Sequence, residues 1–205
     1  MNELLKYIQE KMKFRYLTTV TATHYTQSER KINSLLFANN FSLKFLEIPL
    51  WISSIVQSAF RNCLEIESLE CDPKWLPLFP NPANVKRVCV PKGVTCITKD
   101  SFKNYDNLEE LSLPMSLSSE NCEEGCFDNL ALGVFIGDPT FLHKIPKCNL
   151  VILKIPNFVI EIAEKSCENC INLKEVIFLK SSELRSIKSR AFANCPLLRS
   201  VAIPE

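Results

Sequence analysis

Cysteines are the residues of this 205-residue chain that are best suited to chemistry, and ten are present. Cys167 and Cys170 form a Cys-x-x-Cys pair, and Cys122 and Cys126 are four residues apart. Thiolates at such spacings hold zinc or exchange with disulfides. A zinc site would need two more ligands nearby, yet the chain has only two histidines and no second Cys-x-x-Cys. We therefore expect no metal and no cofactor, and keep a thiol-based regulator or metal binder using Cys167 and Cys170 as an alternative.

The other reactive residue types form no catalytic arrangement. His24 and His143 have no Ser or Cys partner that the repeating pattern of the chain would bring beside them. The carboxylate pairs Glu109-Glu110 and Glu123-Glu124 are interpreted as solvated exterior side chains rather than as an acid and base. The four glycines match no phosphate-binding loop. These absences predict a protein that is not an enzyme.

Composition indicates a globular protein without a nucleic-acid or membrane signature. Apolar residues make up 46% of the chain, and 24 basic against 23 acidic residues give a net charge of +1. This balance gives no electrostatic reason to expect nucleic acid or an anionic membrane. No stretch approaches the roughly 20 apolar residues of a membrane span, and the first residues lack the apolar run of a secretory signal. We expect no membrane insertion, and a cytoplasmic location is favoured.

A repeat organises most of the chain. The stretches "FANNFSLKFLEIP" (37–49) and "FANCPLLRSVAIP" (192–204) share one pattern, whose opening Phe we call position 0. The same pattern recurs with spacings of 17 to 25 residues, which predicts a solenoid of about eight coils. The position 0 residues are Phe37, Phe60, Phe79, Phe102, Phe127, Cys167 and Phe192, with a degenerate copy near Lys144.

Each position of the repeat predicts a local structure. Asn occupies position +2 in seven of the eight copies, which indicates a left-handed residue that ends a short helical turn. Positions +6, +9 and +11 are apolar, and Pro often follows at +12, so a short strand is expected around +8 to +10. Stacked coils would bury these apolar residues in one core and align their strands in a parallel sheet. Most of the cysteines occupy small or apolar positions of the repeat and are interpreted as core thiols, and Cys170 and Cys195 are expected to be free.

The pattern L-x-x-L-x-(I/L)-P, followed by two V/I positions and A-F-x-N-C, resembles the BspA-like (Treponema pallidum type) leucine-rich repeat. The clearest copies are "VKRVCVPKGVTCITKDSFKNYDNLEELSLP" and "LVILKIPNFVIEIAEKSCENCINLKEVIF", and the resemblance covers about residues 37–205. It implies an α/β fold: a leucine-rich-repeat solenoid with a parallel β-sheet of short strands on one face and short helical turns and loops on the other. It also implies a non-enzymatic binding scaffold. Because such proteins often act on the surfaces of bacteria and protists, a cell-surface adhesin or antigen is an alternative to an intracellular adaptor.

Strand residues at +8 and +10 should point away from the core and form an open face for a protein partner. An apolar cluster of Phe135, Ile152 and Ile177 on this face would mark a contact site. Alternatively, the shortened coil 139–150 folds over the cluster or shifts its register. The expected partner-binding residues are Phe45, Glu47, Glu70, Arg87, Glu110, Phe135, Ile152, Lys154, Glu175 and Ile177.

The two ends of the chain differ from its middle. Residues 1–36 are predicted to be a helical capping segment, with one helix over 2–12 and a second after Thr26, ahead of a solenoid over 37–205. At the other end nothing covers the last coil, although solenoids usually need a polar cap. This predicts either a homodimer through the C-terminal coil or weak order there.

Overall fold

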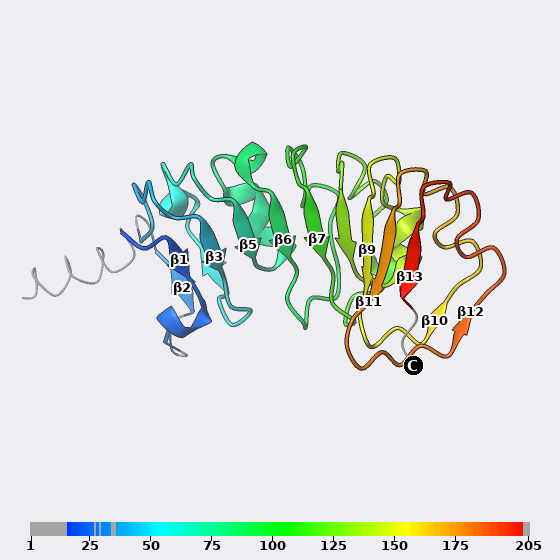
Figure 1. Cartoon of the computed structure of the whole chain (residues 1–205). Helices are drawn as coiled ribbons and strands as arrows, with labels where there is room; N and C mark the ends of the chain where they lie inside the picture. The colour runs from blue at the N-terminus through cyan, green and yellow to red at the C-terminus, as the bar shows by residue number, and fades with distance from the viewer. Residues whose placement is uncertain (1–15, 27, 29, 34–35, 203–205) are drawn as a thin grey trace, which may run out of the picture.

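The computed structural model describes residues 16–26, 28, 30–33 and 36–202, and it shows a solenoid built on one long parallel sheet (Figure 1). Nine strands follow one another in the order β1-β3-β5-β6-β7-β8-β9-β11-β13, and every pair is parallel. The strands are β1 (Thr19–Val20), β3 (Phe45–Glu47), β5 (Ser68–Glu70), β6 (Arg87–Cys89), β7 (Glu110–Ser112), β8 (Val134–Ile136), β9 (Ile152–Ile155), β11 (Glu175–Phe178) and β13 (Ser200–Ala202).

Behind the long sheet, each coil returns through short strands or single helical turns. Two further parallel pairs join β2 (Lys31–Ile32) to β4 (Ser54–Ile55) and β10 (Glu161–Ile162) to β12 (Ser186–Ile187). The helical turns are 3-10 in type: η1 (Ala22–His24), η2 (Gln57–Phe60), η3 (Pro73–Leu78), η4 (Pro82–Asn84), η5 (Ser119–Asn121) and η6 (Pro139–His143). The predicted fold class is therefore confirmed.

The asparagines at +2 hold the left-handed backbone that the sequence predicts in five of seven copies. These five have φ between 56° and 67°: Asn39, Asn62, Asn104, Asn169 and Asn194. Asn81 differs, with φ −134°, because Pro82 follows it and the residue before a proline is driven to extended backbone. Asn129 also lies outside the left-handed set, and in its coil the positive φ of 77° falls on Gly125. Asparagine at +2 thus serves the backbone turn of most coils.

Aromatic rings at position 0 form a ladder through the core. Phe37, Phe60 and Phe79 stack at centroid distances of 5.4 and 4.6 Å, and Phe102 lies 5.7 Å from Phe127. All five rings are buried. Burying one such side chain contributes about 1.5–3 kcal/mol, so the ladder is a main source of stability between coils.

Asparagine side chains add polar links between neighbouring coils. The Nδ2 of Asn62 donates to Oδ1 of Asn39 over 2.8 Å, and Asn194 donates in the same way to Asn169 over 2.9 Å. These links hold successive left-handed turns in register at the edge of the stack.

The coil that begins at Phe127 departs from the predicted register by one residue. Val134, rather than Phe135, pairs with Glu110 on one side and Ile152 on the other. Phe135 therefore occupies the inward position between Leu111 and Leu153 and is fully buried. The expectation that Phe135 lies on the open face is wrong, because this coil has one residue fewer between its opening Phe and its strand.

The segment before Phe37 contributes strands to the solenoid. β1 pairs with β3, and β2 pairs with β4, so the sheet begins ahead of the predicted boundary at residue 37. The expected second helix after Thr26 is wrong at Lys31 and Ile32, which form β2. The expected helix over 2–12 lies outside the described residues, and the division of the chain into a cap and a solenoid stays a prediction.

Candidate functional site

Outward side chains of the long sheet form two rows that run along the stack, one at +8 and one at +10, and together we call them the open face. The register of the strand pairs aligns nine of the ten predicted partner-binding residues in these rows and leaves out Phe135. The +8 row reads Phe45, Ser68, Arg87, Glu110, Val134, Ile152, Glu175 and Ser200. The +10 row reads Glu47, Glu70, Cys89, Ser112, Ile136, Lys154 and Ile177. Binding by these residues stays a prediction.

Four aliphatic side chains gather on β8, β9 and β11, and we call Val134, Ile136, Ile152 and Ile177 the aliphatic patch. Val134 lies directly opposite Ile152, while Lys154 stands between Ile136 and Ile177 in the other row. All four aliphatic side chains remain partly exposed. The shift of one residue thus exchanges one aromatic ring for two aliphatic side chains on the open face.

Sequence reasoning missed Val134 and Ile136, although one signal could have found them. Core residues at +6 and +9 are always three apart, as in Leu43 and Leu46. Leu132 and Phe135 have this spacing, and both are buried. Aligning on that pair instead of on Phe127 would have given the observed register.

The shortened coil 139–150 packs into the core rather than over the aliphatic patch. Within it, Phe141, Leu142 and Ile145 are buried, and the ring of Phe141 contacts that of Phe127 at 6.5 Å. Of the two alternatives that the sequence left open, the shifted register is therefore the one observed, and the patch is left accessible.

Charged side chains border the aliphatic patch on both sides. In the +8 row, Glu110 precedes Val134 and Glu175 follows Ile152. Lys154 is the one cation within the described rows from β8 to β11. The surface is therefore apolar at its centre and acidic at its two flanks.

The N-terminal part of the open face is acidic and partly preorganised. Glu47 and Glu70 lie opposite each other on β3 and β5, and the backbone N–H of Ala22 donates to Glu47 Oε2 over 2.7 Å. Burial, and then the neighbouring charge of Glu47, raises the pKa of Glu70. Two negative charges at strand spacing repel each other. This repulsion is relieved when one carboxyl is protonated or when a cationic group binds beside the pair.

The Cys-x-x-Cys pair is placed in the core, which weakens the thiol-regulator alternative at that position. Cys167 and Cys170 are buried, and burial raises the pKa of Cys167 to about 12 and that of Cys170 to about 11. Such thiols are rarely ionised at neutral pH, and the thiolate is the reactive form. All ten cysteines are unlinked thiols in the structure. Within the described ranges, no group of three or more His, Cys, Asp or Glu side chains is arranged to hold a metal ion.

The fold is that of a leucine-rich-repeat solenoid. It has a parallel sheet with one strand per coil, a core of stacked position 0 rings, and helical turns on the side of the core away from the sheet. TLR13, in a crystal structure of the TLR13-ssRNA13 complex, matches with a TM-score of 0.51 and 16% identity over 90% of this chain. This chain spans 24% of the TLR13 chain. A leucine-rich repeat protein from Bacteroides ovatus is 15% identical over 96% of this chain and 68% of its own, with a TM-score of 0.33. No curated protein sequence matches.

The family follows from the repeats themselves. The BspA type leucine-rich repeat region matches residues 77–146 and 134–205, with six copies, and so covers more than half of the chain. The chain belongs to the BspA type leucine-rich repeat family, as its motifs predict. In the part of the chain that the structure describes, no helix has the length and apolar character needed to cross a membrane.

Proposed function

We propose that this protein is a non-enzymatic interaction scaffold that binds a segment of a protein partner on its open face, centred on the aliphatic patch. The observation that carries the proposal is the patch itself: partly exposed aliphatic side chains on three neighbouring strands that no described segment covers. Contiguous apolar surface of this kind marks interaction sites in soluble proteins. The repeat architecture supports it, because solenoids present extended surfaces for binding.

The charges around the patch indicate what the partner segment would carry. Apolar side chains would cover Val134, Ile136 and Ile152, while Lys or Arg side chains on either side would face Glu110 and Glu175. Charge complementarity of this kind mainly sets specificity and association rate, and the buried apolar contacts supply most of the affinity. We therefore expect an apolar segment with flanking basic residues.

Nucleic acid is a less fitting ligand for this surface. TLR13 is described with single-stranded RNA, but that statement concerns TLR13. Here the open face carries Glu47, Glu70, Glu110 and Glu175, and carboxylates repel a phosphate backbone. A cell-surface adhesin of the same family would use the same patch and differ in the partner that it meets.

Affinity capture with matched variants tests the proposal. The variant Val134→Ser/Ile152→Ser removes the centre of the patch, and Met115→Ser/Ile160→Ser removes two exposed apolar side chains outside the two rows as a control. Proteins that wild type and control capture equally, and that the patch variant captures at least ~10-fold less, would be the partners, since truncating a central contact typically costs 1–2 kcal/mol or more. Circular dichroism would establish that each variant is folded. Identical capture by folded wild type and folded patch variant would refute the proposed site.

A further inference from the structure

The spacing of side chains on the open face indicates the shape of the partner segment, and this inference rests on the proposed function of the aliphatic patch. In the +8 row, Glu110, Val134, Ile152 and Glu175 stand on four consecutive strands of the long sheet. Neighbouring strands lie about 4.8 Å apart, so these four positions fall at about 0, 4.8, 9.6 and 14.4 Å along the row. A segment that covers the two aliphatic side chains and reaches both carboxylates therefore runs across the strands.

An α-helix matches this spacing. It rises about 1.5 Å per residue, so residues i, i+3, i+7 and i+10 lie at about 0, 4.5, 10.5 and 15.0 Å along its axis. Each of these positions falls within about 1 Å of one strand of the row. The four residues also share one face of the helix, because at about 100° per residue they span only about 80° around its axis.

The +10 row gives the same helix a second line of contact. Ile136 lies on the same face of β8 as Val134, and residue i+4 of the helix, about 6 Å along its axis, would lie over it. Residues i+3, i+4 and i+7 together form the apolar stripe of an amphipathic helix, which is about 100° wide. Lys154 in the +10 row does not exclude such a helix, since a Lys side chain lays its carbon stem on apolar surface and keeps its ammonium in water.

An extended segment fits the row less well. Its same-face residues i, i+2 and i+4 lie at about 0, 6.6 and 13.2 Å, so three side chains would have to serve four strands. The central one would lie between Val134 and Ile152 rather than over either of them. A polyproline II segment repeats every three residues, or about 9.3 Å, and would therefore contact only alternate strands.

A second copy of the chain is a poor occupant of the open face. The aliphatic stretch of the +8 row has a carboxylate at each end, Glu110 and Glu175. A two-fold axis through the patch would bring carboxylates of one copy against carboxylates of the other, and like charges across an interface oppose association. Within the described part of the chain, neither carboxylate belongs to an ion pair, so both are available to cations of a different partner.

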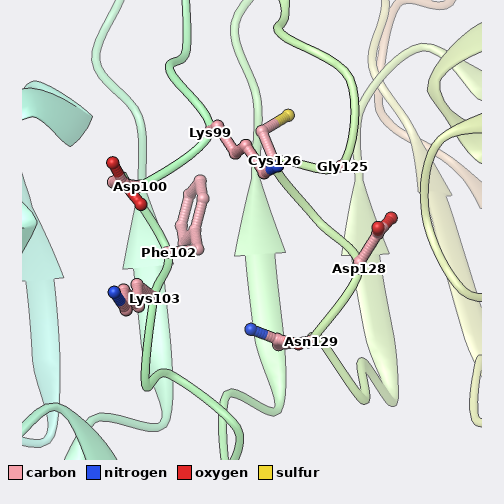
Figure 2. Close-up of a pocket in the computed structure, with 8 residues that line it drawn as sticks. All are labelled: Lys99, Asp100, Phe102, Lys103, Gly125, Cys126, Asp128 and Asn129. Carbon is pink, nitrogen blue, oxygen red and sulfur yellow. The ribbon is translucent and has the colours of Figure 1, made fainter.

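The cavity shown in Figure 2 is too small for a helical segment. It measures about 290 Å³, lies between the turns at Phe102 and Phe127, and shares no residue with the two rows of the open face. A helix is about 10–12 Å across, so one turn of it fills about 400–600 Å³. Both Lys99 and Asp128 line the cavity, and it therefore shows no clear preference for the charge of a ligand.

From these spacings we propose that the partner segment is an amphipathic α-helix that lies across β7, β8, β9 and β11. It carries apolar side chains at i+3, i+4 and i+7 and basic side chains at i and i+10. Of the two acidic contacts, Glu175 is the stronger. Arg87 stands directly beside Glu110 in the +8 row, whereas Lys154, the other cation of the described rows, stands in the +10 row.

Three synthetic peptides of about 14 residues test the proposal by fluorescence anisotropy with the purified protein. The first carries Lys at i and i+10 and Leu at i+3, i+4 and i+7 in a background of Ala and Gln. The second has Pro at i+5, which breaks the helix but keeps every contacting side chain. The third has the composition of the first but places the same five side chains at every second residue. The first peptide should bind at least ~10-fold more tightly than the other two.

Protein variants, each established as folded by circular dichroism, connect this binding to the open face. Val134→Ser/Ile152→Ser should weaken binding of the first peptide at least ~10-fold. Glu175→Gln should weaken it more than Glu110→Gln does, and both should reduce its dependence on salt. An equal effect of the two Gln variants would contradict the assignment of Glu175 as the stronger contact.

Other occupants give distinct results. If the second or third peptide binds as tightly as the first and Val134→Ser/Ile152→Ser abolishes this binding, the helix is refuted, but the proposed function stands with an extended segment. If sedimentation shows a dimer of wild type that the same variant abolishes, the occupant is a second copy and the helix is again refuted. If none of the peptides binds, the proposed helix is wrong, and affinity capture decides separately whether the open face binds a partner.

The variant Met115→Ser/Ile160→Ser is the matched control for all three peptides. It removes exposed apolar side chains outside the two rows and should bind each peptide as wild type does. An equal loss of binding in this control and in the patch variant would overturn the proposal, because the peptides would then bind exposed apolar side chains without regard to their position.

Discussion

Replacing Gly137 with alanine should destabilise the protein, because Phe135 points inward. Gly137 is buried at a position where the other coils carry large apolar residues such as Ile48, Leu113 and Ile155. A Cβ added at Gly137 would lie 2.6 Å from Cζ of Phe135 and 3.2 and 3.3 Å from its two Cε atoms. The ring of Phe135 therefore fills the space that a side chain at 137 would need.

The size of the effect follows from two opposing terms. Contacts between carbon atoms are favourable at about 3.5–4.0 Å, so a Cβ at 2.6 Å forces a buried ring to move, and such overpacking costs about 1–3 kcal/mol. A glycine-to-alanine change in compatible backbone stabilises by about 0.4–1 kcal/mol through the unfolded chain. We expect a net loss of about 1–2 kcal/mol. If Phe135 faced outward, only the second term would remain and the sign would reverse.

Urea unfolding followed by circular dichroism measures the change in the free energy of unfolding. Gly133→Ala is the matched control, because its added Cβ would meet nothing closer than the Glu109 carbonyl oxygen at 3.8 Å, and it should be neutral or slightly stabilising. In the double variant Phe135→Leu/Gly137→Ala, the smaller side chain should relieve the clash, so the loss should be about 1 kcal/mol smaller than the sum of the single losses. A stabilised Gly137→Ala protein, or strictly additive losses, would refute the inward placement of Phe135.

Three further expectations concern the turns, the acidic end and the last coil. Asn62→Ala places a side chain without local hydrogen bonding at φ 63° and should lower the free energy of unfolding by about 1–2 kcal/mol, whereas Asn62→Gly should cost less in the same urea titration. Since burial and Glu47 raise the pKa of Glu70, the folded state holds that proton more tightly than the unfolded chain. The stability of wild type relative to Glu70→Gln should therefore fall as pH rises above 4.5, and a difference that does not change with pH would contradict this. Leu198 and Val201 are only partly buried, whereas Leu173 and Val176 at the same positions of the preceding coil are fully buried. We therefore predict that the 205-residue polypeptide self-associates through this coil. Sedimentation that shows a monomer for both wild type and Leu198→Lys would contradict this prediction.

Sequence patterns predicted most of the fold because each coil repeats the same local requirements. Asn at +2 meets the need for a left-handed residue, and apolar residues at +9 meet the need for a buried strand position. Several copies reinforce one another, so an exception such as Asn81 does not hide the repeat. The first coil was missed because Val20 and Ile32 stand in a segment without the position 0 phenylalanine and the +2 asparagine, although their strands pair as in the other coils.

The composition of the open face was less predictable, because it depends on loop length rather than on residue type. A strand alternates its side chains between two faces, so the loss of one residue before β8 exchanges inward and outward positions throughout that strand. Phe135 is apolar enough for either face, and nothing in its own identity selects one. Phe135 can point inward because Gly137, two residues later on the same face, has no side chain to occupy the space of the ring. The inward orientation therefore depends on the two residues together.

Contacts between coils set a second limit on sequence interpretation, and the cysteines show it. Cys122 and Cys126 occupy small or apolar positions of the repeat, which is why the sequence favours core thiols, and both are indeed buried. The carbonyl oxygen of Cys122 accepts a hydrogen bond from Lys144, which lies 22 residues further along the chain in a coil of irregular length. The repeat predicts that neighbouring coils stack, but an irregular coil does not reveal which of its side chains will reach back. In this fold, therefore, regular coils fix the core, and the irregular coil from Phe127 to Leu150 supplies both β8 of the aliphatic patch and the lysine that contacts the Cys122 carbonyl.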